Sequence, residues 1–396
     1  MIPEDWQLRP MLSAVRVATG QVDPKVEPYR SMTLVAPDHI ESNSGRLLKK
    51  ETASDQRAIS GKYLFVKGDI VYSKIRPYLR KAILADFDGL CSADMYPLKP
   101  ASDVSAGFIL AAMLGHHFSK YAESVSVRSG MPKINRAELA EYTIALPPTK
   151  TEQESIAEAL SDADALIESL EQLLAKKRQL KQGAMQELLT GNKRLPGFSG
   201  EWEVKRLEAL ADIRSGGTPS TTQPQFWDGD ILWCTPTDIT GLNGLKYLND
   251  TSRKISLLGL KSSSAEIIPA NSIVMTSRAT IGECAINRVP VSTNQGFKNF
   301  VPFEGVDVEF LYYVLLTQKQ GFISLCGGST FLEIGKAQLA IFEVCVPTTK
   351  AEQTAIAAIL FDMDAEIGAF EAKLAKARQL KQGMMQELLT GRIRLV

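Results

Sequence analysis

The chain has 396 residues, enough for two or more domains with hydrophobic cores of their own. Its 45 basic and 45 acidic residues cancel, which excludes a global basic field but leaves room for local basic patches. Five cysteines, with no two close together in the sequence, argue against a disulfide framework and a CxxC zinc site and favour a reducing compartment.

The apolar segments predict neither a leader peptide nor a membrane anchor. The first residues, "MIPEDWQLRP", have no basic region followed by an apolar core, so we expect no signal peptide. The longest apolar run, "FILAAMLG", is far shorter than a membrane-spanning helix. We therefore expect a soluble, cytoplasmic protein.

Residues 1–146 predict a first domain of mixed α and β structure. Short apolar runs such as "GDIVYS" predict strands, and "GFILAAMLGHHFSKY" predicts a helix. The stretch "YSKIRPYLRKA" interleaves basic and aromatic residues, a pattern suited to phosphate contacts and base-edge reading. An ordinary charged surface loop is the alternative interpretation. The candidate DNA-binding residues here are Ser73, Lys74, Arg76, Tyr78, Arg80 and Lys81.

Residues 147–195 predict one long helix. Thr149 can cap it, and Glu152 follows at the spacing of a capping box. Apolar residues then alternate in steps of four and three, which is the pattern of a coiled-coil seam. Gly191 stands where a helix-ending glycine is expected. Such a helix of about 40 residues is roughly 60 Å long at 1.5 Å per residue.

Residues 196–346 predict a second domain on a similar plan. Trp202 opens it as Trp6 opens the first, and "FEVCVP" closes it as "YTIALP" closes the first. Asn and Gln side chains can pair with adenine and Arg with guanine, and the loop 214–227 can offer backbone N–H groups to phosphates. The candidate DNA-binding residues here are Gly216, Gly217, Thr218, Ser277, Arg278, Thr280, Asn294, Gln295 and Lys298.

Residues 347–396 repeat the long helix at an offset of 200. About thirty of roughly fifty positions are identical, and "RQLKQGxMQELLTG" occurs in both copies. We expect the two helices to pair antiparallel within the chain, the alternative being pairing with other chains. Packing alone would tolerate swaps throughout, so the near-identical ends predict a docking surface presented twice. Its candidate residues are Arg178, Lys181, Gln182, Met185, Leu188, Arg378, Lys381, Gln382, Met385 and Leu388.

Motifs for catalysis are missing from the sequence. We find no P-loop, no GxGxxG loop, no HExxH and no Asn/Asp-Pro-Pro-aromatic motif of adenine methyltransferases. We interpret His39, His116 and His117 as surface or packing residues. The sequence therefore predicts no catalytic residue and no metal site.

Two variable domains alternating with helices of the type "TxxEQxxIAxxL…KQGxMQxLLTGxxRL" resemble the specificity subunits of type I restriction–modification systems. "GFSGEWEVKRL" and "SGGTPS…FWDGDILWCTPTDI" add to the resemblance, whereas "ATGQVDP" in the first domain departs from it. The likeness covers essentially the whole chain.

This resemblance implies an α+β fold with two target recognition domains, 1–146 and 196–346, each reading half of a split, asymmetric DNA site. The spacers 147–195 and 347–396 would form an antiparallel coiled coil that fixes the gap between half-sites. Two methyltransferase subunits would dock on these helices, with restriction subunits joining them. Those partners would bring S-adenosylmethionine, ATP and Mg²⁺, and this non-catalytic chain would bind none of these cofactors.

Two other functions remain open from the residues alone. The chain could be a coiled-coil adaptor with two protein-binding domains and no DNA role, in which case binding to duplex DNA would lack a steep salt dependence. It could also be a self-contained methyltransferase with unusual motifs, which would bind S-adenosylmethionine by itself.

Overall fold

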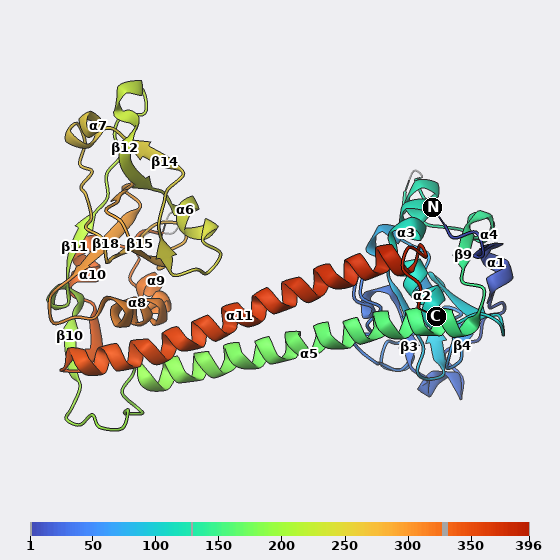
Figure 1. Cartoon of the computed structure of the whole chain (residues 1–396). Coiled ribbons are helices and arrows are strands. Elements are labelled where there is room, and N and C mark those ends of the chain that lie inside the picture. Colours follow the sequence, from blue (N-terminus) through green and yellow to red (C-terminus); the bar gives the residue numbers. More distant parts are fainter. Residues whose placement is uncertain (1, 128–129, 327–331, 396) are drawn as a thin grey trace. The chain divides into compact units, whose positions relative to one another are not determined.

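The computed structural model describes residues 2–127, 130–326 and 332–395. The chain forms two compact units, of which the first joins segments from both ends of the sequence (Figure 1). Unit 1 comprises Met1–Leu173 with Phe370–Val396, and unit 2 comprises Leu174–Ala369. Two 39-residue helices, α5 (Lys150–Leu188) and α11 (Lys350–Leu388), each begin in one unit and end in the other. Their lengths confirm the two predicted long helices.

In unit 1, one sheet has the strand order β2-β8-β5-β6 and a second has the order β3-β7-β4. A separate antiparallel pair, β1 with β9, joins the beginning and the end of the first domain. The strands are β1 (Gln7–Pro10), β2 (Val15–Val17), β3 (Leu34–Val35), β4 (Tyr63–Phe65), β5 (Ile70–Ser73), β6 (Ala82–Leu84), β7 (Gly89–Cys91), β8 (Met95–Pro100) and β9 (Thr143–Leu146). The α-helices are α1 (Met11–Ala14), α2 (Ala106–Leu114), α3 (His116–Val125) and α4 (Arg136–Glu141).

The helix predicted over "GFILAAMLGHHFSKY" is divided into α2 and α3 at Gly115. A side chain at Gly115 would approach the carbonyl oxygen of Ala112 and the side chain of Leu389 to 3.1 and 3.2 Å. The glycine therefore allows the chain to turn tightly against Leu389, just after the end of α11, which the helical periodicity of the sequence does not reveal.

In unit 2, the larger sheet has the order β11-β18-β15-β16-β13 and the smaller has the order β14-β12-β17. The pair β10 with β19 repeats the arrangement of β1 with β9. The strands are β10 (Glu203–Arg206), β11 (Ala211–Ser215), β12 (Trp227–Cys234), β13 (Tyr247–Leu248), β14 (Arg253–Ile255), β15 (Ser272–Thr276), β16 (Cys284–Asn287), β17 (Ser292–Thr293), β18 (Phe297–Pro302) and β19 (Glu343–Val346). The α-helices are α6 (Pro236–Gly241), α7 (Leu257–Lys261), α8 (Val308–Thr317), α9 (Lys319–Ser324) and α10 (Lys336–Ala340).

Each long helix is fixed to the domain that precedes it by the same hydrogen bonds. The hydroxyl of Thr149 accepts the N–H of Glu152, as the cap prediction requires. Gln153, which is buried, accepts the N–H of Ser105 at 2.8 Å and donates to the Pro147 carbonyl. Ser105 is the N-cap of α2, so this glutamine joins the beginnings of α2 and α5. In unit 2, Gln353 makes the equivalent bonds to Asp307 and Pro347.

The two glutamates predicted to complete capping boxes instead bind arginines. Glu152 is only 2 % exposed, and its carboxylate binds Arg394, with Nη2 to Oε2 at 2.8 Å. Glu352 is equally buried and binds Arg194 in the same way. We call these two pairs the carboxylate clamps. The second clamp has one more donor, the indole N–H of Trp202 at 3.3 Å from Glu352.

The helices pair antiparallel within each unit, because later positions on one helix meet earlier positions on the other. The ion pairs are Asp164–Lys381 and Glu171–Arg378 in unit 1, and Asp364–Lys181 and Glu366–Lys177 in unit 2. The α+β class with two mixed domains and two long paired helices is therefore confirmed. Among the described residues, none of the helices combines the length and apolar character needed to cross a membrane.

Candidate nucleic-acid interface and helical surface

The loop after β15 carries an exposed arginine on a well-supported backbone. Arg278 forms a backbone bridge with Glu333, and the N–H of Ile334 donates to the carbonyl of Ser277 at 3.1 Å. Arg278 Nε lies 2.9 Å from Glu333 Oε2. Held through Nε, a guanidinium still has its two terminal nitrogens for a bidentate contact with a base.

A second cation, Lys298, lies beneath this ion pair. Its residue is 6 % exposed, and its Nζ is 4.0 Å from Glu333 Oε1. Burial lowers the pKa of Lys298 because the charged ammonium loses its hydration, and the nearby Glu333 carboxylate partly opposes this effect. The predicted DNA contact at Lys298 is therefore corrected: this side chain is a buried neighbour of Glu333, not a surface group.

The corresponding loop of the first domain, after β5, begins with the same two backbone features. Ala279 has a φ of 57°, and Arg76 in the first domain has a φ of 48°. Such left-handed conformations cost a non-glycine residue of the order of 1–2 kcal/mol. In the first domain, Ile75 forms a backbone bridge with Lys133, as Arg278 does with Glu333. The two loops therefore begin alike but present different side chains at the bridge: Arg278 and Glu333 form an ion pair in the second domain, whereas Ile75 and Lys133 stand there in the first.

The first-domain candidates divide into surface groups and internal ones. Arg76 and Tyr78 are exposed, and the Nζ of Lys74 lies 5.2 Å from the ring centre of Tyr96. Three others each make one hydrogen bond within the domain, which leaves Arg80 and Lys81, both half-buried, with further donors, whereas Ser73 is buried. Ser73 Oγ donates to the Ile75 carbonyl, Arg80 Nε donates to Ser119 Oγ, and Lys81 Nζ donates to the Pro37 carbonyl.

The glycines predicted to offer N–H groups to phosphates are packed inside the second domain. The N–H of Gly217 donates to the Thr293 carbonyl at 2.9 Å, and that of Gly216 donates to the Phe297 carbonyl at 3.4 Å. A Cβ atom at either glycine would overlap neighbouring backbone atoms. Close packing, not phosphate binding, is therefore the reason for glycine at both positions.

Among the remaining second-domain candidates, Thr280 and Gln295 are exposed. Gln295 accepts a hydrogen bond from the hydroxyl of Thr218. Ser277 is fully buried, and the side-chain oxygen of Asn294 accepts the N–H of Gly296 at 2.8 Å. Fewer second-domain candidates are therefore exposed than were predicted to contact DNA, and Arg278 is the charged one among them.

The sequence interpretation missed Lys133, Arg136 and Glu333. Arg136 lies 5.8 Å from the ring centre of Tyr96, the same ring that Lys74 approaches. A signal was present, because "KINRAELA" at 133–140 and "EIGKAQLA" at 333–340 align at the same offset of 200 as the helices. In that short match Lys133 of the first domain aligns with Glu333 of the second, so the charge at this position differs between the domains.

The duplicated end of the long helices exposes only some of the predicted docking residues. Leu188 and Leu388 are each 5 % exposed and belong to the cores, so their predicted contact with a partner is corrected. Met185 and Met385 are half-buried against the same cores, and Lys181 and Lys381 form the ion pairs described above. Gln182, Gln382, Arg178 and Arg378 are exposed.

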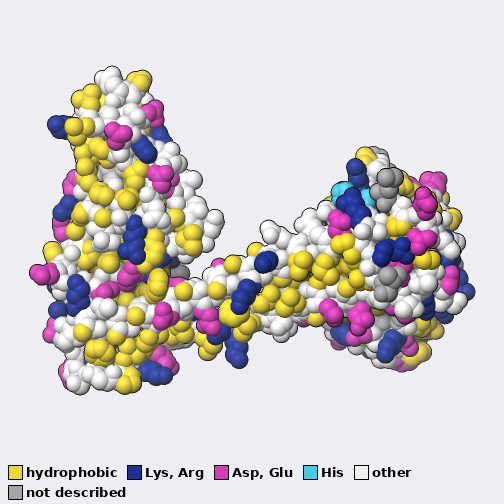
Figure 2. All heavy atoms as spheres, in the orientation of Figure 1, with side chains coloured by type: hydrophobic (Ala, Val, Ile, Leu, Met, Phe, Trp, Pro, Cys, Tyr) yellow, Lys and Arg dark blue, Asp and Glu magenta, His cyan; other side chains and the backbone are white. Residues whose placement is uncertain are grey.

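A surface leucine was missed in both copies. Leu180 is 50 % exposed and Leu380 is 60 % exposed, although each stands among exposed polar residues. Figure 2 shows apolar side chains on the surface of the long helices, interspersed with lysine and arginine. An apolar residue repeated at a position that is at least half exposed favours a role in contact with a partner.

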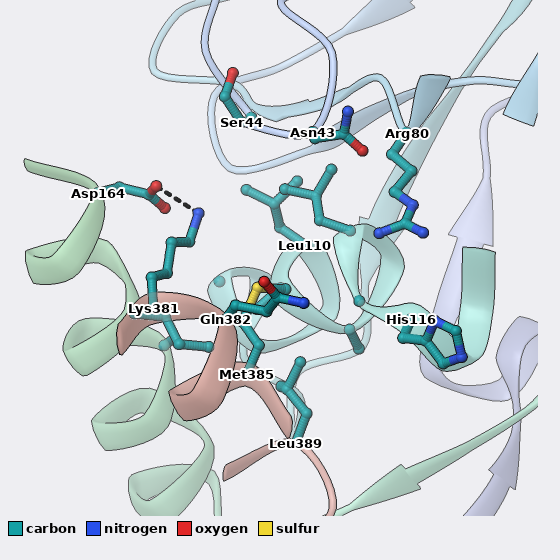
Figure 3. A pocket seen from close by; sticks show the side chains of 18 of the residues that line it. Asn43, Ser44, Arg80, Leu110, His116, Asp164, Lys381, Gln382, Met385 and Leu389 are labelled. Carbon is teal, nitrogen blue, oxygen red and sulfur yellow. Dashed lines mark hydrogen bonds and ion pairs between the residues drawn. The ribbon is translucent and has the colours of Figure 1, made fainter. Parts of the chain in front are cut away.

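Unit 1 also contains a groove of about 1480 Å³ between α2 and the long helices. Figure 3 shows Leu110 of α2 facing Met385 of α11 and Leu389, which follows that helix, with the Asp164–Lys381 ion pair at one side. Within the described part of the chain, no group of His, Cys, Asp and Glu side chains is arranged to hold a metal ion.

Comparison with known proteins places the chain in a family. Residues 35–178 and 199–378 match the family described as the type I restriction modification DNA specificity domain. The chain therefore belongs to this family, as its repeated organisation predicted.

Individual relatives show the same likeness. The chain is 37% identical over 166 residues to the type I restriction enzyme MjaIX specificity subunit of Methanocaldococcus jannaschii, covering 41% of this chain and 38% of that protein. It is 32% identical over 217 residues to the EcoDI specificity subunit of Escherichia coli, covering 54% and 47%. These matches span less than half the length of either relative.

A solved structure supports the fold over the whole length. The type I restriction–modification S subunit from M. genitalium covers 98% of this chain and 96% of its own, with a TM-score of 0.61 and 16% sequence identity. At this identity the likeness concerns the fold alone.

Proposed function

We propose that this chain is the DNA-specificity subunit of a type I restriction–modification complex and has no catalytic role of its own. Its two domains each read one half of a split DNA site, and the long helices set the spacing between the two half-sites. The observation that carries the proposal is the pair of loops that begin alike, with a backbone bridge followed by a left-handed residue, but carry different side chains at the bridge, Ile75 in one and Arg278 in the other. A fixed scaffold with exchanged side chains suits two modules that read different sequences.

In the second domain we assign base reading to Arg278, with Gln295 and Thr280 beside it. An arginine can contact guanine O6 and N7 bidentately, and glutamine can do the same with adenine. In the first domain, Lys74, Arg76 and Tyr78 take the corresponding place, and Lys133 adds a cation for phosphates. These local cations support DNA binding although the whole chain has no net charge.

The duplicated helix ends supply the docking surface for two methyltransferase subunits, with Leu180 and Leu380 as apolar anchors. S-adenosylmethionine, ATP and Mg²⁺ belong to the methyltransferase and restriction subunits of the complex. Because each copy of the sequence carries the same exposed residues, one kind of partner can bind twice.

The test is DNA binding by the complex of this chain with its methyltransferase subunits, using wild type and Arg278→Ala. If Arg278 reads a base, affinity for the cognate site falls by about 1–3 kcal/mol, or roughly 5- to 150-fold, and non-specific affinity changes much less. Equal losses on both DNAs would instead make Arg278 a phosphate contact. A wild-type complex that shows no salt-dependent DNA binding would contradict the proposed function and favour the adaptor.

A further inference from the structure

The two units are built alike where each domain meets the long helices, so their side chains can be compared position by position. Gln153 binds the N-cap of α2, and Gln353 binds the N-cap of α8. Because these N-caps are Ser105 and Asp307, positions on α2 and α8 correspond at an offset of 202. Positions on α5 and α11 correspond at the repeat offset of 200.

In unit 2 larger side chains occupy the corresponding place between domain and helices, although Phe361 among them stays 43 % exposed. Tyr313 of α8 donates its hydroxyl hydrogen to Asp364 Oδ2 at 2.7 Å, while Lys181 binds the other oxygen of the same carboxylate. Burial raises the pKa of the Tyr313 phenol, so the hydroxyl stays protonated and acts as the donor. Lys246 lies beside this tyrosine, and its Nζ is 4.4 Å from the ring centre of Phe361.

In unit 1 the corresponding residues are small. Ala111 stands where unit 2 has Tyr313, Ser161 stands where it has Phe361, and Gly107 stands where it has Glu309. All three small residues line the groove of about 1480 Å³. The groove therefore lies where one half of the chain has small residues and the other half has large side chains.

The polar group that receives the tyrosine in unit 2 is nevertheless kept in unit 1. Asp164 binds Lys381 through Oδ1, as Asp364 binds Lys181. Among the described residues, no hydrogen bond reaches Asp164 Oδ2, the atom equivalent to the one that accepts the Tyr313 hydroxyl. The groove thus combines an apolar wall from Leu110 and Met385 with one available carboxylate oxygen.

We infer that this groove receives an aromatic side chain with a polar tip, such as tyrosine, from the methyltransferase subunit docked on the second helix copy. The groove is continuous with that docking surface, because Lys381, Gln382, Met385 and Gln386 of the duplicated segment line it. The carboxylate of Asp164 complements a hydroxyl donor, as its equivalent does in unit 2. This inference rests on the proposed function and deepens it, because it makes the two docking sites different.

The test fills the groove from within the chain. Ala111→Tyr introduces the side chain that unit 2 already carries at this position, and Ala137→Tyr adds the same side chain at an exposed site of α4 away from the groove. Full-length variants are titrated with the methyltransferase subunit of the same system, and stoichiometry is measured by native mass spectrometry. We expect Ala111→Tyr to weaken one of the two binding events at least tenfold without lowering the thermal midpoint, and Ala137→Tyr to behave as wild type.

A second variant keeps the test decisive if Ala111→Tyr is unstable. Ser161→Phe fills the groove from the helix side, at a position where the other helix copy already has phenylalanine. Two methyltransferase subunits bound with unchanged affinity to a stable filled variant would overturn the inference. The inference would also be overturned if a filled variant bound methyltransferase normally but no longer formed a dimer of this chain or no longer bound DNA. Either result would mean that the groove receives a second copy of the chain or DNA instead. A wild-type chain that binds no methyltransferase would instead contradict the proposed function.

Discussion

Glu333 offers a way to separate base reading from simple charge attraction. In Glu333→Gln the carboxylate that holds Arg278 is replaced by a neutral amide of nearly the same shape. Both members of the pair are partly exposed, 46 % for the Arg278 side chain and 38 % for that of Glu333. Such a pair contributes no more than about 1 kcal/mol to folding, so the variant is expected to remain folded.

Glu333→Gln is expected to change DNA affinity more than folding stability, and to change it differently for cognate and random DNA. A guanine contact that depends on a fixed arginine is worth about 1–3 kcal/mol, so loss of that orientation should lower cognate affinity roughly 5- to 150-fold. Removing one negative charge should at the same time raise affinity for random duplex DNA and steepen its salt dependence by about one unit of slope. The signature of a positioning residue is therefore opposite changes on the two DNAs.

The assay is fluorescence anisotropy of the chain–methyltransferase complex on cognate and random duplexes over a range of salt concentrations. Glu304→Gln removes an exposed carboxylate elsewhere in the same domain and serves as the matched control. Glu333→Asp, which keeps the charge, should recover part of the cognate affinity. If Glu333→Gln bound both DNAs more tightly, Glu333 would act only by repelling DNA through its charge. If the variant bound both DNAs more weakly, Glu333 would serve only to maintain the structure. Either result refutes the positioning argument.

Three further predictions concern stability and docking. Arg394→Ala should lower the thermal unfolding midpoint more than Arg194→Ala, because only the second clamp keeps an indole donor on its buried glutamate; equal shifts would contradict this. Lys298→Met should be at least as stable as wild type at pH 7 in urea unfolding, because burial lowers the pKa of Lys298 and the protonated form destabilises the fold. That difference should shrink as the pH rises through the lowered folded-state pKa towards 10.5, and a difference that widens would be inconsistent with the burial argument. Leu180→Lys and Leu380→Lys should each weaken methyltransferase binding at least tenfold in calorimetric titrations with little change in thermal midpoint, whereas a large loss of stability would mean that the leucines serve folding.

The parts of the fold that follow from local pattern were predictable from the sequence. The seam spacing and the repeated Thr149 cap predict two long helices, and both form with the expected length. Short apolar runs such as those of β5 and β15 also form strands. What the pattern did not reveal was the partner of Glu152, since the arginine that binds it is 242 residues away in the chain.

The candidate site was harder to predict because residue type alone does not indicate which atoms are exposed. Gly216 appeared suited to a phosphate-binding loop, but its N–H is used inside the domain. Lys298 lies in a strand whose first four residues are all buried, and only the tertiary structure places it under Glu333. Comparing the two copies of the repeat would have identified candidate site residues better than the motifs did. Equivalent positions whose charge differs, such as Lys133 and Glu333, show where the two domains present different surfaces.

Methylation mapping tests the central claim most directly. The chain is co-expressed with its methyltransferase subunit in cells free of other adenine methylation, and modified adenines are located by sequencing. The account predicts a motif of two short half-sites separated by a fixed gap, and Arg278→Ala should relax only one half. A single continuous motif, methylation that does not depend on this chain, or relaxation of both halves by that variant would contradict the assignment of one half-site to each domain.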